Sequence, residues 1–142
     1  MSYTTPSVPD FLDQLEDALK AEFPLVDIVQ GIDNETPEHD RIEIVRVSFE
    51  YEQPTMKAGR LERDERFIVS LYLYSVKPGG TTREAKAQVY EFATAIDDML
   101  ANKGFADFLY VGASEGTLEL AYTTAGAEAA MLYSIAVETR LY

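Results

Sequence analysis

Residues 66–76 constrain the fold more than any other segment, because apolar and aromatic residues occupy nearly every position of a strand-like run. Side chains alternate between the two faces of a β-strand, so this strand would be apolar on both faces. The first face carries Phe67, Val69, Leu71 and Leu73, and the second carries Ile68, Tyr72 and Tyr74. Such a strand belongs in the middle of a sheet. We therefore expect each face of that sheet to contact either a helix or a neighbouring subunit.

The same period of two predicts further strands. In residues 42–51 the apolar residues from Val45 onward share one face, whereas Ile42 and Ile44 fall out of phase with them. This change of phase predicts a β-bulge near Ile44 and Val45, or a strand start that is buried on both faces. The remaining predicted strands cover about 25–32, 107–122 (with an interruption at 113–116) and 129–142.

Two amphipathic helices are predicted, at about 8–23 and 82–103, from apolar residues spaced three and four apart. Pro24 ends the first helix. Thr81 and Glu84 form a capping box at the start of the second helix. The order of elements is therefore α-β-β-β-α-β-β.

This order predicts an α+β fold, with a mostly antiparallel sheet of about five strands and two helices packed on it. The chain has 142 residues and is 46% hydrophobic, which suffices for one sizeable core. It contains no internal repeat and no linker that would divide it. We expect residues 1–142 to form a single domain.

The composition argues against several classes of function. Twelve Lys and Arg oppose 25 Asp and Glu, and the net charge of −13 argues against general binding to DNA phosphates. The absence of Cys excludes disulfides and thiolate metal sites, and a single His leaves little for a catalytic relay or a metal cluster. We therefore expect a non-enzymatic protein with no catalytic residues, no cofactor and no metal.

The sequence also lacks the features of a membrane or secreted protein. No apolar run reaches the roughly 18 to 20 residues that span a bilayer. The first residues have neither the basic stretch nor the apolar core of a signal peptide. We expect a soluble protein that is made in the cytoplasm and does not contact a membrane.

Residues 52–65 (EQPTMKAGRLERDE) join two predicted strands and are too long and too charged for a tight hairpin turn. Two interpretations remain open: a flexible solvent-exposed loop, or an extended arm that becomes ordered on a partner. The arm is the one segment in which cations keep pace with acids. The candidate docking residues are Met56, Lys57, Arg60, Leu61 and Arg63.

Asp97 and Asp98 lie near the end of the second predicted helix. Adjacent helical residues point about 100° apart, so the two carboxylates would not share a catalytic site. Acids near a helix C-terminus are mildly unfavourable. We interpret the pair either as ordinary solvated surface or as part of an acidic exposed face.

Nine Tyr residues are a high number for a chain of this length, and tyrosine is enriched at interfaces. Tyr72 and Tyr74 on the central strand are candidates for a subunit interface. The chain also ends on a predicted strand, which would leave an edge or an apolar end exposed. Leu141 and Tyr142 are therefore further interface candidates.

The order of elements and the charged arm resemble the tail terminator proteins of long-tailed bacteriophages, the lambda-type family. The resemblance is carried by residues 65–74 (ERFIVSLYLY), by the helix beginning TREAKAQVYEF at residue 82, and by the closing pair GTLELAY and LYSIAVETR at 116–122 and 132–140. It covers nearly the whole chain and rests on architecture and length, since the family has no sharp motif.

The resemblance implies a homo-oligomeric ring, usually a hexamer, that caps the tail tube, ends its polymerisation and offers a surface to the head connector. DNA would pass through the ring without specific binding, along an acidic lumen to which Asp97 and Asp98 could contribute. The arm would reach toward the tube or a neighbouring subunit. The protein would reside in the virion, at the head-proximal end of the phage tail.

Two alternatives stay open. A head-completion or neck protein would have a similar size and fold. A small-ligand binding module would use a pocket between the helices and the sheet.

Overall fold

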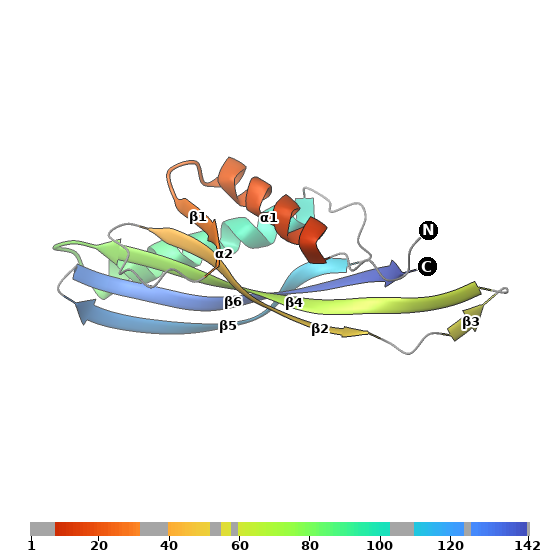
Figure 1. The fold of residues 1–142 in the computed structure, drawn as a ribbon. Coiled ribbons are helices and arrows are strands. Elements are labelled where there is room, and N and C mark those ends of the chain that lie inside the picture. Colours follow the sequence, from red (N-terminus) through yellow and green to blue (C-terminus); the bar gives the residue numbers. More distant parts are fainter. Residues whose placement is uncertain are drawn as a thin grey trace.

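A computed structural model describes residues 8–31, 40–51, 55–57, 60–102, 110–123 and 126–141 of the chain. Figure 1 shows two helices lying over a long twisted sheet. The elements are α1 (Val8–Glu22), β1 (Asp27–Gln30), β2 (Arg41–Tyr51), β3 (Thr55–Lys57), β4 (Arg60–Lys77), α2 (Thr82–Asn102), β5 (Tyr110–Thr123) and β6 (Gly126–Leu141).

The main sheet has the strand order β1-β2-β4-β6-β5, and the short strand β3 pairs with β4. All neighbouring strands are antiparallel except β1 and β2, which are parallel. The α+β fold, the mostly antiparallel sheet and the order of helices and strands are confirmed. The additional strand β3 lies within the segment expected to be a loop.

Two irregularities in the sheet lie where the sequence predicts them. The register between β2 and β4 shifts between Ile44 and Arg46, which confirms the predicted bulge. A second shift, between Ala113 and Glu115, lies in the predicted interruption, and β5 continues through it as one strand. Each bulge inserts one residue and thereby changes which residues face the helices.

The second helix begins as the capping pattern predicts. The Thr81 hydroxyl accepts a hydrogen bond from the Glu84 amide at 3.3 Å, and the Thr81 carbonyl accepts one from the Ala85 amide at 3.2 Å. The first contact satisfies an amide that a helix start otherwise leaves unpaired, and the second is the first regular hydrogen bond of the helix.

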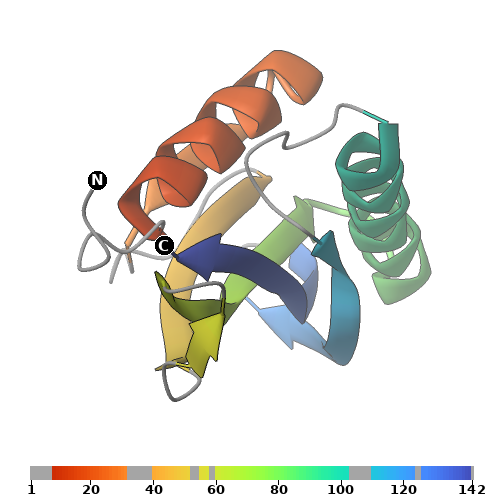
Figure 2. The same ribbon diagram turned by 90° about the vertical axis from the view of Figure 1, so that its right-hand side faces the viewer.

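Both helices pack on the same face of the sheet, and Figure 2 shows them side by side above its curved surface. The rings of Phe11 in α1 and Phe67 in β4 meet edge to face, with centroids 5.5 Å apart. The other fully buried large side chains of this core are Leu15, Leu19, Ile42, Val69, Leu71, Leu73, Val89, Ile96 and Ile135.

The opposite face of the sheet, here called the open face, is not covered by any helix that the structure describes. Ile68 and Leu132 on this face are 44% and 38% exposed. We expected a helix or a neighbouring subunit on each face of the sheet, and the described helices cover one face only.

Replacing Phe67 by alanine tests this assignment of faces. We expect Phe67→Ala to lower the free energy of unfolding by about 3 to 5 kcal/mol, because it leaves a cavity beneath α1. The neighbouring Ile68→Ala, on the open face, should cost less than about 1 kcal/mol. Urea unfolding monitored by circular dichroism measures both variants. Equal losses would contradict the assignment.

Candidate assembly surfaces

The described part of segment 52–65 is a β-hairpin. β3 pairs with the first residues of β4, so that Met56 lies opposite Leu61 and Lys57 opposite Arg60. The hairpin extends beyond the ends of both helices (Figure 1). The expectation of a loop too long for a hairpin is wrong for these residues, because β3 resumes the pairing that β2 and β4 make up to Tyr51.

The end of the chain lies beside this hairpin. Arg63 of β4 is the register partner of Leu141 in β6. Tyr142, the other terminal interface candidate, lies outside the described residues. The backbone therefore brings the arm and the C-terminal strand to the same end of the sheet, together with all the candidate docking residues: Met56, Lys57, Arg60, Leu61 and Arg63.

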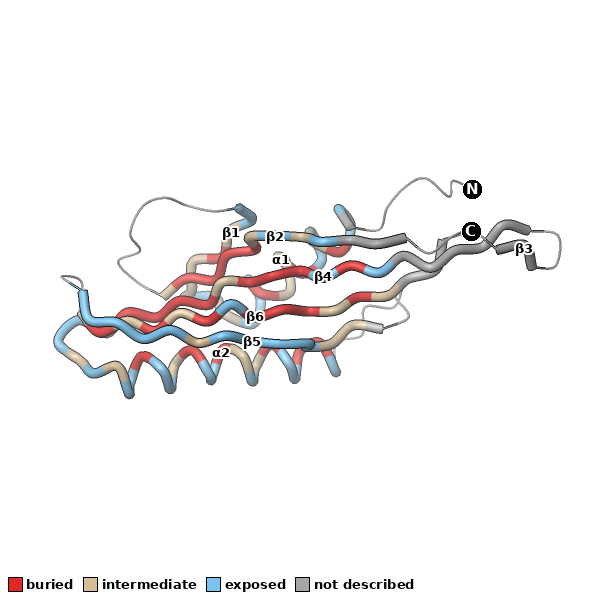
Figure 3. Tube along the Cα trace, turned by 90° about the horizontal axis from the view of Figure 1, so that it is seen from below, coloured by how far each residue is buried: buried red, intermediate tan, exposed pale blue. Residues whose placement is uncertain are grey.

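Strand β6 lies inside the sheet and not at its edge. It pairs with β4 along nearly its whole length and with β5 up to Glu138. Of the two alternatives expected for the terminal strand, the exposed edge is therefore wrong for residues 126–138, and the exposed apolar end stays a prediction. Among the described strands, the long unpaired edge belongs to β5 (Figure 3).

The two tyrosine candidates on β4 differ in their accessibility. Their rings stack with centroids 6.4 Å apart and 17° between the planes. Tyr72 is half-buried, whereas Tyr74 is only 5% exposed within its own chain. Tyr74 is therefore corrected from an interface candidate to a buried residue of the open face. Tyr72 stays a candidate.

Carboxylates surround Tyr72 on the open face. Burial raises the pKa of Tyr72, and the charges of Glu119, Glu43 and Glu128 raise it further. Burial and the nearby Glu128 also raise the pKa of Tyr74. The open face therefore carries an acidic cluster, defined here as Glu43, Glu119 and Glu128, in addition to the acids that sequence reasoning selected. The sequence shows that these acids alternate with apolar residues along their strands. It does not show that the three acids lie near one another, because that depends on which strands pair.

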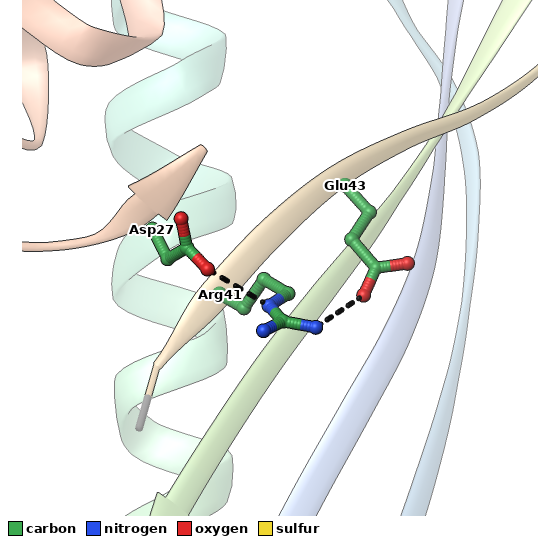
Figure 4. Close-up of polar contacts among 3 residues, drawn as sticks. All are labelled: Asp27, Arg41 and Glu43. Atoms are coloured by element: carbon green, nitrogen blue, oxygen red, sulfur yellow. Dashed lines mark hydrogen bonds and ion pairs between the residues drawn. The ribbon is translucent and has the colours of Figure 1, made fainter. Parts of the chain in front are cut away.

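A partly buried ion-pair network ties β1 to β2 and includes Glu43 of this cluster. Arg41 contacts Asp27 at 3.1 Å and Glu43 at 3.4 Å (Figure 4). Arg41 and Asp27 are also register partners in the parallel pair. Glu43 is 5% exposed, so removing the charge of Arg41 would leave this carboxylate buried without its ion-pair partner, whereas removing Glu43 would leave Arg41 paired with Asp27. We interpret this network as structural.

Asp97 and Asp98 are both exposed on α2, in the helical layer. The charge of Asp97 contributes to the raised pKa of Tyr133, so its carboxylate acts on the space between α2 and the sheet. The two acids lie on the layer opposite the acidic cluster of the open face. The structure therefore does not bring them together with Tyr72.

A groove of about 360 Å³ lies between α2 and β5. Its lining residues are Tyr90, Ala93, Ala113, Ser114, Glu115, Gly116, Leu118, Met131 and Tyr133. Gly116 contributes no side chain, and the lining is mainly apolar. The sequence predicted a pocket between the helices and the sheet but not its lining residues. These depend on the bulge in β5, which changes which side chains face α2.

The hydroxyl of Tyr133 is buried in this region without a hydrogen-bond partner among the described residues. Burial, followed by the charge of Asp97, raises the pKa of Tyr133 to about 12. A phenol with this pKa stays protonated at neutral pH and can only donate or accept a hydrogen bond. It is therefore not a candidate general base.

In the part of the chain that the structure describes, no three acidic, His or Cys side chains gather in a way that could hold a metal ion. His39 lies outside the described residues. Neither described helix is long and apolar enough to cross a membrane.

Comparisons with known proteins place the fold but not the family. No protein-family model matches the chain, and a search of curated proteins gave no match. The fold is similar to that of a chain in the virion of a native gene transfer agent particle, with a TM-score of 0.50 and 12% sequence identity. The likeness covers 89% of this chain and 90% of that chain, and thus nearly the whole fold.

Replacing Tyr133 by phenylalanine tests the state of its hydroxyl. We expect Tyr133→Phe to raise the free energy of unfolding at pH 7 by about 1 kcal/mol, because an unpartnered buried hydroxyl is costly. The raised pKa means that the native state holds the phenolic proton more tightly than the unfolded chain. This preference for the protonated form leaves stability unaffected below pH 10, and the free energy of unfolding falls as the pH rises from 10 toward 12.

Tyr133→Phe should therefore remove part of the alkaline loss of stability, measured by urea titrations across that pH range. Tyr90→Phe, with a side chain 51% exposed in the same groove, is the matched control and should behave like the parent protein. A lower stability of Tyr133→Phe at pH 7 would show that the hydroxyl has a partner.

Proposed function

We propose that this chain is a structural protein of a phage-like virion and, more specifically, a tail terminator. The fold likeness carries the proposal, since the similar chain belongs to the virion of a gene transfer agent particle. The order of elements, which resembles tail terminators, supports the finer assignment. In this role the protein acts without catalysis, as a ring of six copies at the head-proximal end of the tail.

The hairpin of β3 and early β4 is the proposed contact with the tail tube or a neighbouring subunit. The helices do not extend over it (Figure 1). Its sequence combines Met56 and Leu61 with the cations Lys57, Arg60 and Arg63. Because the hairpin is already paired in the free chain, docking needs less ordering of its backbone than a flexible loop would need.

The net charge of −13 supports the passage of DNA through such a ring without binding. Salt screens charges beyond about 8 to 10 Å, so only acids near the channel wall repel the phosphates effectively. Asp97 and Asp98 serve this purpose if the helices face the axis. Glu119 and Glu128 repel the phosphates if the open face lines the channel.

A head-completion or neck protein is the runner-up, because it shares the size, fold and acidic character proposed here. The partner decides between the two roles. A terminator should be retained by assembled tail tubes, whereas a neck protein should be retained by the portal or connector and not by tubes.

The groove between α2 and β5 favours one further candidate function, the binding of a small ligand. The Tyr133 hydroxyl, which has no hydrogen-bond partner among the described residues, could donate a hydrogen bond to a mainly apolar molecule. A metabolite panel should then contain compounds that raise the melting temperature of the parent protein. The same compounds should not raise the melting temperature of Tyr133→Phe.

Deleting residues 55–62 tests the docking role of the hairpin. β4 pairs with β6 from Arg63 onward, so the deletion removes only β3 and its partners in β4. We expect the free energy of unfolding to change by less than about 1 kcal/mol, whereas capping of tail tubes is lost. Electron microscopy of polymerising tubes measures the capping as a limit on tube length.

A double variant, Arg83→Ala with Lys86→Ala, is the control for lost positive charge, since both cations are exposed on α2. It should cap tubes normally. Failure of the deleted chain to fold would show that the hairpin belongs to the core. If the parent protein neither forms rings nor binds tube ends, the tail terminator role is wrong.

A further inference from the structure

We propose that neighbouring copies join edge to edge, with β5 of one copy pairing with the outer half of β2, residues 46–51, of the next. The sheet would then continue from subunit to subunit. This inference rests on the proposed function in one respect, that the ring needs a contact between copies. The residues that make this contact come from the structure of a single chain.

Strand β5 presents one unpaired edge. It has 14 residues and pairs with β6 alone among the described strands. Residues 113–117 and 119–123 are exposed, and Figure 3 shows the strand along the rim of the sheet. On the side away from β6, no described strand pairs with the backbone of residues 111–122, and an edge of this kind is the usual template for pairing with another chain.

The outer half of β2 presents the second unpaired edge. β1 pairs with β2 only up to Ile44, whose carbonyl accepts a hydrogen bond from the Gly31 amide at 2.8 Å. Gly31 has a φ of 116°, a conformation that favours glycine, and β1 ends just before it at Gln30. The bulge between Ile44 and Arg46 follows at once. Residues 46–51 consequently pair with β4 on one side and with no described strand on the other.

The two edges have the right direction to meet. β2, β4, β6 and β5 alternate in direction, so β5 runs antiparallel to β2 within one chain. A rotation about a ring axis preserves the component of each strand's direction along that axis. If the strands run mainly along the axis, as this contact requires, the neighbouring β2 is therefore also antiparallel to β5. Two different edges that meet in this way form a head-to-tail contact, which is the kind that closes into rings.

The register also matches the two edges on the open face. Arg46 lies opposite Ser70, Ser70 opposite Ser134, and Ser134 opposite Glu115, which places Arg46 and Glu115 at the two ends of one row. Both end residues are exposed. Continued into the next subunit, the row would bring an arginine beside a glutamate, a favourable cross-strand pair.

The adjacent row matches the edges on the helix-covered face. It runs from Val47 through Val69 and Ile135 to Ala113. Ala113 lines the groove between α2 and β5, whose lining is mainly apolar. A neighbouring β2 laid against β5 would therefore direct Val47 toward this groove while Arg46 faces Glu115, as strand alternation requires.

Disulfide cross-linking tests the contact without interference, because the chain contains no cysteine. Arg46→Cys and Glu115→Cys are made as separate proteins and as one double variant. Opposed residues of antiparallel strands lie about 4.5 to 5.5 Å apart between Cα atoms, which suits a disulfide. Closing a sheet into a ring staggers its strands, so Thr117→Cys and Glu119→Cys, further along the same face, replace Glu115→Cys in parallel samples.

We expect an equal mixture of the two single variants to give covalent dimers, and the double variant to give a ladder of multimers that ends at the closed ring. Oxidation is carried out on the free protein and on protein bound to tail tubes. Glu91→Cys, exposed on α2, paired with Arg46→Cys is the control and should give no ladder.

Each outcome separates the interface from the proposed function. Glu115→Cys that links to itself as readily as to Arg46→Cys would overturn the head-to-tail contact in favour of a two-fold dimer. Tube capping without any ladder at the three β5 positions would overturn the edge pairing and leave the terminator role intact. A ladder in protein that never caps tubes would support the pairing and refute the terminator role. If the protein stays monomeric and gives no ladder, both alone and after mixing with tubes, the edge pairing is wrong.

Discussion

The pairing of β4 with β6 is the interaction on which the rest of the structure depends. These two long strands are antiparallel over nearly their whole lengths and form the centre of the sheet. Their helix-facing side chains, Phe67 and Ile135 among them, supply the surface on which both helices pack. Their far ends continue past the helices and support the hairpin and the end of the chain. The core and the candidate assembly surfaces are therefore parts of one ladder.

The placement of both helices on one face creates the asymmetry of the molecule. A sheet buried on one side by helices can leave its other side to solvent only if that side is polar enough. Here Tyr72 and the acidic cluster of Glu43, Glu119 and Glu128 share the open face with the partly exposed Ile68 and Leu132. The result is a face with apolar and charged parts, suited either to a neighbouring subunit or to a channel wall.

The sequence predicted those features that depend on local periodicity and capping, such as the strand around Leu71, the bulge at Ile44 and the cap of α2 at Thr81. It could not predict which strands pair. For that reason an exposed edge was one of the two alternatives for the terminal strand, whereas β5 lies outside β6. It also treated Tyr74 as accessible, although burial on the open face depends on neighbours that are distant in sequence.

Charge and edge pairing act at different distances in the proposed assembly. Copies that each carry a net charge of −13 repel one another, and this repulsion extends over about a Debye length, roughly 8 to 10 Å. The hydrogen bonds of a strand edge act only at contact. Free copies are thus kept apart although their edges are unpaired, and a tail tube that holds several copies side by side would supply the missing proximity. Acidic composition opposes association and exposed edges favour it, and a ring that closes only at the end of a tube requires both.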